Sequence, residues 1–413
     1  MTHLTRACLL PLAMTTLAAI PISGHASPTL YGAIFETVEV IESRHATSPS
    51  DGGSGVNYGR TSRLSSHSSM FGIKGEESLG NGLSAFYQIE SSLNANAGTG
   101  NIAGRNTGVG LKSPHWGTIV LGHWDTPMKL SSVRADPWRT NTLAGYNTLI
   151  NSPGFGIGKQ KLGDGSPNSA SAAFDMRATN TIQYWSPTVF NLSARLMLTT
   201  SNKIYAPAND RQYDPYLWGF SLTYDKGPLW VSYAYEHHKD YFGINSMVQS
   251  AQSSFSSPPF TVGGDESGSS DQAHRVSAGY TLGNTTLGLV YERLKYRNEG
   301  ATASLAMQRY ERDLIYASVE HKFANAHRVR LAYGQTTRVK CSVIAGSCPD
   351  DALGARMFTV GYAYDLSRRT QLVAQYAQVN NQSLASYTFG DNSPPSAAGA
   401  TLRGFSLGMA HRF

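Results

Sequence analysis

Residues 355–365 read ARMFTVGYAYD, and their side chains alternate in character along the stretch. The even positions from 358 to 364 carry Phe, Val, Tyr and Tyr, whereas the odd positions from 357 to 363 carry Met, Thr, Gly and Ala. Successive side chains of a β-strand point to opposite faces, so one face of this stretch is apolar and the other is small and mixed. A β-strand that crosses a bilayer needs about 9–11 residues. We therefore interpret the stretch as a candidate transmembrane strand.

The same period of two recurs along the chain. PLWVSYAYE (228–236) and HRVRLAYG (327–334) alternate in the same way, and no segment of ten or more residues carries an apolar stripe of helical spacing. The alternating segments number about sixteen. They lie near 29–42, 62–75, 82–93, 105–113, 117–124, 177–186, 190–200, 216–225, 228–238, 271–281, 284–297, 308–323, 327–339, 355–365, 370–379 and 400–413.

The connections between these segments alternate between short and long. Seven short ones lie at 76–82, around Pro114, and at 186–190, 225–228, 282–284, 324–326 and 366–369. Eight long ones lie near 43–61, 94–104, 125–176, 201–215, 239–270, 298–307, 340–354 and 380–399. Sixteen antiparallel strands with both termini on the short-turn side would have this pattern, which is typical of outer-membrane barrels.

These observations predict an all-β chain that forms a 16-stranded antiparallel transmembrane β-barrel with short periplasmic turns and long outer loops. The alternative is a soluble β-sandwich, which also alternates but buries one face in a dry core. Here the non-apolar face is mainly Gly, Ser, Thr, Gln and charged residues, which suits a water-filled interior. Tyr and Trp near the ends of the segments suit aromatic girdles, and closure satisfies every backbone donor and acceptor.

The first 26 residues differ from the rest and are predicted to form a cleaved signal peptide. One Arg and no acid precede an apolar run from Ala7 to Ile20, which is followed by Pro21 and small residues up to Ala26. The alternative, a transmembrane anchor, requires a longer uninterrupted apolar run. The expected mature protein is residues 27–413, exported from the cytoplasm.

Charge and cysteine content restrict the remaining classes. The net charge of +6 and the pI near 9.1 are compatible with nucleic-acid binding, but the chain has no basic helix and no recognisable nucleic-acid-binding motif.

Cys341 and Cys348 lie in a polar loop of an exported chain and are predicted to form a disulfide, with metal binding as the weaker alternative.

Five stretches in order and spacing resemble the Gram-negative general-diffusion porin family, the trimeric sixteen-stranded proteobacterial outer-membrane porins. The stretches are TLYG (29–32), FGIKGEESLGNGLSAFYQIE (71–90), VGLKSPHWGTIVLGHWDTP (109–127), RATNTIQYWSP (177–187) and GMAHRF (408–413). The resemblance covers nearly the whole mature chain. It implies a homotrimer in the outer membrane, in contact with lipid and lipopolysaccharide, in which a long loop after the fifth strand folds into each barrel. Here that constriction loop is about residues 125–176.

Alternation orients the residues of the predicted pore wall. It places Met70, Gly72 and Lys74 toward the lumen and Phe71 and Ile73 toward lipid.

Two wall cations that are usual in the resembling family are replaced in this chain. An arginine usually stands at the position of Met70, and the family reads GRQ where this chain has Gly-His-Trp at 122–124. Arg105 and Arg177 match wall arginines of the family. The predicted inner loop carries Lys129, Arg134, Arg139, Lys159 and Lys161 against Asp125, Asp136 and Asp164. We expect a weak anion preference and a weaker transverse field than is usual in the family.

His123 is predicted to make selectivity depend on pH. An unperturbed imidazole is mostly neutral near pH 7, so acidification below about pH 6.5 would add positive charge. Simple alternation groups His123 with Ile119 and Leu121 on the lipid side, so a lumen position requires a bulge near Gly122.

The terminal stretch LRGFSLGMAHRF (402–413) is predicted to be the closing strand, paired with the first strand near 29–42. Its apolar positions Phe405, Leu407, Met409 and Phe413 would face lipid. By resemblance to the family, Phe413 is expected to be the signal for the outer-membrane assembly machinery.

The predicted function is passive diffusion of ions and small hydrophilic solutes, with no catalysis, cofactor or metal. A substrate-preferring porin is the near alternative. A surface adhesin or receptor is the alternative from a different class.

Overall fold

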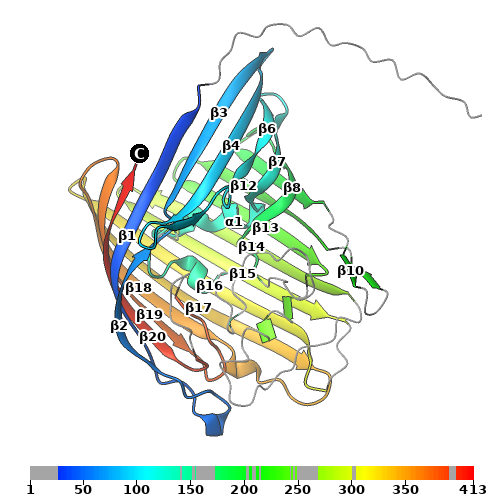
Figure 1. Ribbon diagram of the computed structural model, residues 1–413, viewed down its shortest axis with the longest axis vertical. Coiled ribbons are helices and arrows are strands. Elements are labelled where there is room, and N and C mark those ends of the chain that lie inside the picture. Colours follow the sequence, from blue (N-terminus) through cyan, green and yellow to red (C-terminus); the bar gives the residue numbers. More distant parts are fainter. Residues whose placement is uncertain are drawn as a thin grey trace, which may run out of the picture.

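The computed structural model describes most of residues 27–413 as one antiparallel barrel (Figure 1). The described residues are 27–139, 142–150, 154, 173–200, 204–206, 211–213, 215–241, 243–244, 247–248, 268–299, 304–389 and 397–413. The expected signal peptide, residues 1–26, lies outside them. Within these ranges, no helix has both the length and the apolar character that a membrane crossing requires.

The main sheet contains eighteen strand segments, and a separate hairpin contains two. The strands are β1 (Thr29–Arg44), β2 (Tyr58–Ser66), β3 (Met70–Gly80), β4 (Leu83–Asn94), β5 (Thr99–Asn101), β6 (Thr107–Ser113), β7 (Gly117–Asp125), β8 (Arg177–Trp185), β9 (Leu192–Thr199), β10 (Ile204–Ala206), β11 (Arg211–Tyr213), β12 (Tyr216–Lys226), β13 (Leu229–Lys239), β14 (Ser269–Leu282), β15 (Thr285–Asn298), β16 (Met307–Phe323), β17 (His327–Val343), β18 (Ala355–Asp365), β19 (Thr370–Asn381) and β20 (Thr401–Arg412). The helical elements are η1 (Pro49–Asp51), α1 (Pro127–Ser132), η2 (Val133–Ala135), η3 (Tyr146–Thr148) and η5 (Asp350–Ala352).

The eighteen segments form sixteen barrel strands because two of the strands are interrupted. β2 and β3 pair with the two halves of β1, and β5 and β6 pair with the two ends of β4. β20 pairs with β1 over twelve positions and closes the sheet. The prediction of a closed 16-stranded antiparallel barrel is confirmed.

Alternation along the strands separates the two faces as predicted. In β18 the side chains of Phe358 and Tyr362 are exposed, while Met357, Thr359 and Ala363 are buried. In β20 the exposed fractions of Phe405, Leu407 and Met409 are 50%, 57% and 50%, whereas Ser406 between them is 1% exposed. Exposed apolar side chains on one face and buried polar ones on the other are the reverse of a soluble fold, and they fit an exterior in lipid.

The short turns lie at one end of the barrel and the long connections at the other (Figure 1). Several short turns contain a glycine with positive φ, among them the turns at Gly227 (59°) and Gly283 (56°). Left-handed backbone of this kind costs glycine little and lets two twisted strands reverse within a few residues.

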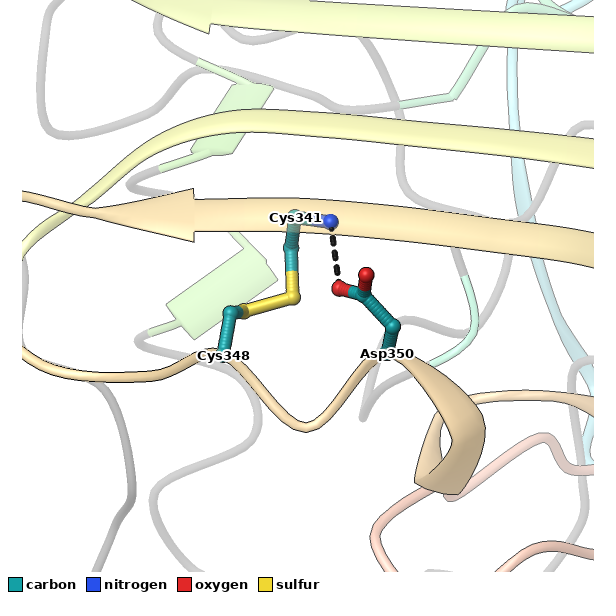
Figure 2. Close-up of a disulfide and its surroundings, with 3 residues drawn as sticks. All are labelled: Cys341, Cys348 and Asp350. Atoms are coloured by element: carbon teal, nitrogen blue, oxygen red, sulfur yellow. Dashed lines mark hydrogen bonds between the residues drawn. A yellow bond between two sulfur atoms is a disulfide. The ribbon is translucent and has the colours of Figure 1, made fainter.

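The predicted disulfide joins Cys341, near the end of β17, to Cys348 in the loop that follows (Figure 2). The carboxylate of Asp350 accepts a hydrogen bond of 2.7 Å from the backbone N–H of Cys341 in the same loop. The disulfide and this hydrogen bond hold the start of the loop against β17.

The buried apolar residues lie inside the barrel. Leu143, Tyr146 and Leu149, which follow α1 and η2 in the chain, pack in one cluster with wall residues such as Leu314 and Met357. The lumen is therefore partly filled by the chain between β7 and β8.

Candidate functional site: the pore lining

The chain enters the lumen directly after β7, where α1 begins. Thr126 caps α1, since its side chain accepts a hydrogen bond of 3.3 Å from the backbone N–H of Lys129, and Pro127 occupies the first helical turn. An N-cap hydroxyl followed by proline is a favourable start for a helix. These residues turn the chain away from the wall and into the barrel.

Beyond α1, the segment follows the inner wall from β16 to β19. The Ser318 hydroxyl on β16 donates to the carbonyl of Ala135. The indole N–H of Trp138 donates to the Thr359 hydroxyl on β18 at 3.0 Å. Further on, Ala144 exchanges hydrogen bonds with the side-chain amide of Gln375 on β19.

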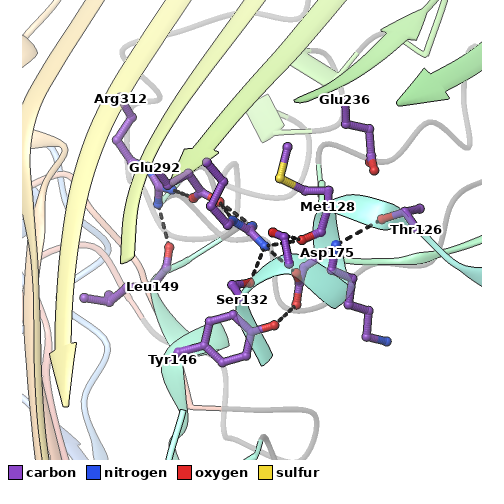
Figure 3. A network of polar contacts seen from close by, with 12 residues as sticks. Thr126, Met128, Ser132, Tyr146, Leu149, Asp175, Glu236, Glu292 and Arg312 are labelled. Atoms are coloured by element: carbon purple, nitrogen blue, oxygen red, sulfur yellow. Dashed lines mark hydrogen bonds and ion pairs between the residues drawn. The ribbon is translucent and has the colours of Figure 1, made fainter. Parts of the chain in front are cut away.

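A buried charge network fixes the same segment to the adjoining part of the wall, from β14 to β16 (Figure 3). Arg275 on β14 and Arg312 on β16 are fully buried, and both form ion pairs with Glu292 on β15. Arg275 also reaches the inner segment, donating to the Met128 carbonyl at 3.1 Å and the Ser132 hydroxyl at 2.8 Å.

Two further contacts extend this network. Arg312 donates to the carbonyl of Leu149 at 2.6 Å. Asp175 pairs with Arg275 at 2.8 Å and accepts a hydrogen bond of 2.6 Å from the Tyr146 hydroxyl. Burial, reinforced by Asp175, raises the pKa of Tyr146 well above its ordinary value, so the hydroxyl stays protonated and donates.

A second ionic group lies where the inner segment leaves β7. Asp125 pairs with Lys129 at 2.6 Å and with Arg177 at 3.1 Å, and its other oxygen accepts from Asn106 at 2.9 Å. Burial lowers the pKa of Lys129, and the charge of Asp125 opposes that effect. Asp125 thereby connects the strand end, the helix and the neighbouring strand.

The inner segment borders a cavity of about 710 Å³ that continues to the short turns. Inner residues Arg134, Asp136 and Arg139 line it on one side, and Met70 and Arg105 line it from the wall. Wall and turn residues complete a lining with nine basic and three acidic side chains. The basic ones are Arg105, Arg134, Arg139, Lys322, Arg328, Arg330, Arg368, Arg369 and Arg412, and the acidic ones are Asp136, Glu320 and Asp365.

Of the residues singled out from the sequence, the structure brings five to this cavity: Met70, Arg105, Arg134, Asp136 and Arg139. Lys74 lies near the short-turn side of β3, 5.1 Å above the ring of Tyr31. Asp125 and Arg177 form the separate ionic group described above.

The irregularity beside His123 lies on β8, whereas the pairing of β7 with β6 stays regular through Gly122 and His123. β8 has two residues, Thr179 and Asn180, in the interval where β7 has only His123. The ring is half-buried, its Nδ1 has no hydrogen-bond partner among the described residues, and it does not line the cavity. A role for His123 in the lumen stays a prediction.

Sequence reasoning did not single out the buried network. Arg275, Glu292 and Arg312 fall on the lumen face of their strands, opposite the exposed Val276, Leu289 and Ile315. Alternation could therefore have placed them inside the barrel, but not against the inner segment, because that contact joins residues more than 140 positions apart.

In sequence, the chain is similar to a known protein family and to known outer-membrane proteins. The Gram-negative porin family matches residues 12–384. An outer membrane porin of Bordetella pertussis is 24% identical over 97% of this chain and 99% of its own length. A major outer membrane protein P.IB of Neisseria meningitidis is 24% identical over 96% and 98%.

Solved structures share the fold. An anion-selective porin from Comamonas acidovorans superposes with a TM-score of 0.68 at 18% identity, covering 94% of this chain and all of that one. The trimer form of OmpT from Vibrio cholerae superposes with a TM-score of 0.59 at 13% identity, covering 94% and 99%.

Proposed function

The chain belongs to the Gram-negative porin family, and we propose that its channel favours small anions over cations. As a family member it is a non-enzymatic channel of the outer membrane. Ion preference is set by the charge of the wall and of the inner segment, because a narrow, water-filled passage exposes a solute to those charges at short range.

The observation that carries the proposal is the excess of basic side chains around the cavity, nine against three. The three acids already have partners: Glu320 pairs with Arg328 and Arg330, Asp365 pairs with Arg328, and Asp136 accepts from the Tyr316 hydroxyl. Within the described chain, Arg139, Lys322, Arg368, Arg369 and Arg412 form no ion pair. These cations remain available to attract a passing anion.

We also propose that the inner segment, residues 125–176, narrows the channel. Arg134 and Arg139 reach the cavity from this segment, and Arg134 lies 4.8 Å above the ring of Trp230 and pairs with Asp225. Arg105, on the wall, pairs with Glu90 and lines the same cavity. The solute path would pass between these groups.

A homotrimer is the proposed assembly, in keeping with a family whose members are typically trimeric. Native mass spectrometry of the detergent-solubilised protein should give a mass of three chains. Single insertions into a planar bilayer should close in three equal steps, and monomers with single-step closures would contradict the proposal.

The ion preference is tested by reversal potentials across a planar bilayer with a KCl gradient. The wild type should give the sign of an anion-preferring channel. Arg368→Gln/Arg369→Gln, which removes two cations from the cavity, should shift the potential toward cation preference. Arg44→Gln/Arg60→Gln removes the same charge from exposed positions outside the cavity lining and should leave the potential unchanged. A cation-preferring wild type would overturn the proposal.

The contribution of His123 is tested in the same bilayers. Reversal potentials should shift toward anions between pH 8 and pH 5 in the wild type and shift less in His123→Asn. Equal shifts in both proteins would assign the pH dependence to other groups.

A further inference from the structure

Three metal-ligating side chains converge in the loop after β17, where Asp350 lies beside the disulfide of Cys341 and Cys348 (Figure 2). Their two sulfur atoms and one carboxylate oxygen lie within 4.8 Å of one another, and no other group of three His, Cys, Asp or Glu side chains among the described residues does so. While the cysteines are joined, their sulfur atoms are bonded to each other and are not thiolate ligands. A metal can therefore bind here only after the disulfide is reduced.

The three residues are held in place by backbone contacts that do not depend on the disulfide. Cys341 lies in the hydrogen-bonded ladder between β16 and β17. Asp350 begins η5, and its backbone N–H donates to the Cys348 carbonyl at 3.0 Å. The end of η5 is tied to the chain after β19, since the N–H of Leu384 donates to the Ala352 carbonyl at 2.9 Å. Reduction therefore leaves both cysteines and the carboxylate on the same frame.

The carboxylate of Asp350 is already oriented for a metal next to the sulfur atoms. One of its oxygens, Oδ1, accepts the 2.7 Å hydrogen bond from the backbone N–H of Cys341. A carboxylate has two oxygens, so the other one can bind a metal while this hydrogen bond persists. Hydrogen bonds of this kind hold metal-ligating carboxylates in a fixed direction.

The spacing of the two cysteines suits a single tetrahedral ion. Their Cα atoms are 5.7 Å apart. Two thiolates on one Zn²⁺ lie about 3.8 Å apart, because each Zn–S bond is about 2.3 Å long. A change of side-chain rotamer separates two sulfur atoms by this amount without moving the Cα atoms.

The site is open to small molecules. Cys341, Cys348 and Asp350 are all only partly buried. Asp350 also lines a cavity of about 300 Å³ that lies beside the loop. A reductant and then a metal ion can therefore reach the three side chains.

We propose that the reduced loop binds one Zn²⁺, or a similar d¹⁰ ion, through the thiolates of Cys341 and Cys348 and the carboxylate of Asp350, with water as the fourth ligand. Two sulfur ligands favour such ions over Ca²⁺ and Mg²⁺, which prefer oxygen. The metal takes over from the disulfide in holding the loop against β17. The site does not depend on the ion preference of the channel, because none of its three residues lines the pore cavity.

The two states are connected by thiol–disulfide exchange with a small external dithiol. Its first thiolate displaces one cysteine sulfur and forms a mixed disulfide, and its second thiolate then releases the other sulfur. The dithiol leaves as a cyclic disulfide, and two electrons and two protons pass to Cys341 and Cys348. The metal binds the two cysteines as thiolates, so both protons are released to solvent.

The probe is Cd²⁺, because a cadmium–thiolate bond has an ultraviolet charge-transfer band that Cd²⁺ bound through oxygen or nitrogen lacks. The folded barrel in detergent is reduced with dithiothreitol, freed of it by anaerobic gel filtration and titrated. The reduced wild type should gain a band that saturates at one Cd²⁺ per chain, whereas the oxidised protein should gain none. Absence of the band in the reduced protein would overturn the proposal.

The contribution of the carboxylate is tested by Asp350→Asn. The amide oxygen can keep the hydrogen bond from Cys341, so this variant should still form the disulfide when it is oxidised. After reduction it should bind Cd²⁺ at least tenfold more weakly than the wild type. Asp351→Asn removes the same charge from the neighbouring exposed residue and should bind like the wild type. Equal affinity of Asp350→Asn and the wild type, or equal weakening in both variants, would overturn the proposal.

Competition identifies the class of metal. Zn²⁺ should displace Cd²⁺ from the reduced wild type and should slow the alkylation of Cys341 and Cys348 by iodoacetamide at least tenfold. Ca²⁺ in large excess should do neither, and displacement of Cd²⁺ by Ca²⁺ would contradict a site built on sulfur. Cys341→Ser/Cys348→Ser, which keeps Asp350, should show no charge-transfer band. A band of wild-type intensity in this variant would place the bound metal elsewhere and overturn the proposal.

Discussion

Met70 is the one uncharged side chain in the cavity lining that sequence reasoning had singled out. It lies opposite Ala33 on β1, which lines the same cavity as Arg105 and Arg139. Met70→Arg should increase anion preference, because the new charge would stand in the lining, and charges within about 8 Å are not fully screened at physiological salt. Reversal potentials under a KCl gradient measure the shift, and Met70→Gln is the neutral control. A shift in the control as large as that of Met70→Arg would assign the effect to size.

Arg275 should stabilise the folded protein because its charge compensates the buried carboxylates of Glu292 and Asp175. Removing one member of a buried ionic network leaves an uncompensated charge and costs about 3–5 kcal/mol. Arg275→Met should therefore lower the free energy of unfolding by that amount in urea titrations of the protein in lipid vesicles. It should also increase current noise in bilayers, since Met128 and Ser132 lose their anchor.

The control for Arg275 is an exposed arginine of the same barrel. Arg44 lies 3.9 Å from Glu42 with half of its side chain exposed, and such surface pairs contribute about 0–1 kcal/mol. Arg44→Gln should unfold almost like the wild type. Equal destabilisation in the two variants would contradict a special role for the buried network.

At the scale of the element, the closing strand β20 joins the two ends of the chain. Phe413 and Gly32 exchange two backbone hydrogen bonds of 3.0 Å. A Cβ at Gly32 would lie 2.4 Å from the ring of Phe413, so the ring covers the glycine and no larger residue fits beneath it.

Deleting Phe413 should lower the yield of assembled barrels more than it changes the conductance of those that form. The deletion removes the last pair of closing hydrogen bonds and the expected assembly signal, but it changes no residue of the cavity lining. Yield is measured as heat-modifiable trimer on gels, and conductance in bilayers. Phe413→Tyr keeps the aromatic ring and should assemble normally. An unchanged trimer yield after the deletion would refute the assembly role.

The strands were predictable because a strand with one face in lipid alternates between apolar outward side chains and small or polar inward ones. All sixteen barrel strands were placed from this period and from connection length, including β20 and its apolar face. The interruptions at Ser68 and near Arg105 were missed, although the outward parity changes across each of them. Leu64 of β2 stands opposite Val38, whereas Ile73 of β3 stands opposite Leu30. The network around Arg275 was missed because parity gives a side chain its face but not its partner across the lumen.

At the scale of the whole molecule, the proposed ion preference is a property of many charges acting together. The cavity lining has nine basic and three acidic side chains, and the basic ones come from segments far apart in the sequence, from Arg105 to Arg412. A field of this kind acts over a distance and is weakened by salt, because the Debye length falls from about 10 Å at 0.1 M to about 3 Å at 1 M.

The anion preference should therefore decline as the mean salt concentration rises at a fixed concentration ratio. Reversal potentials at a tenfold KCl gradient should be largest when both solutions are dilute and should approach the value for free diffusion when the lower side reaches 1 M. Arg368→Gln/Arg369→Gln should follow a lower curve that meets the wild-type curve at high salt. A preference that is independent of salt would instead require a site that binds the anion by direct contact, where screening has little effect. The shape of the salt dependence thus separates a distributed field from a single binding site.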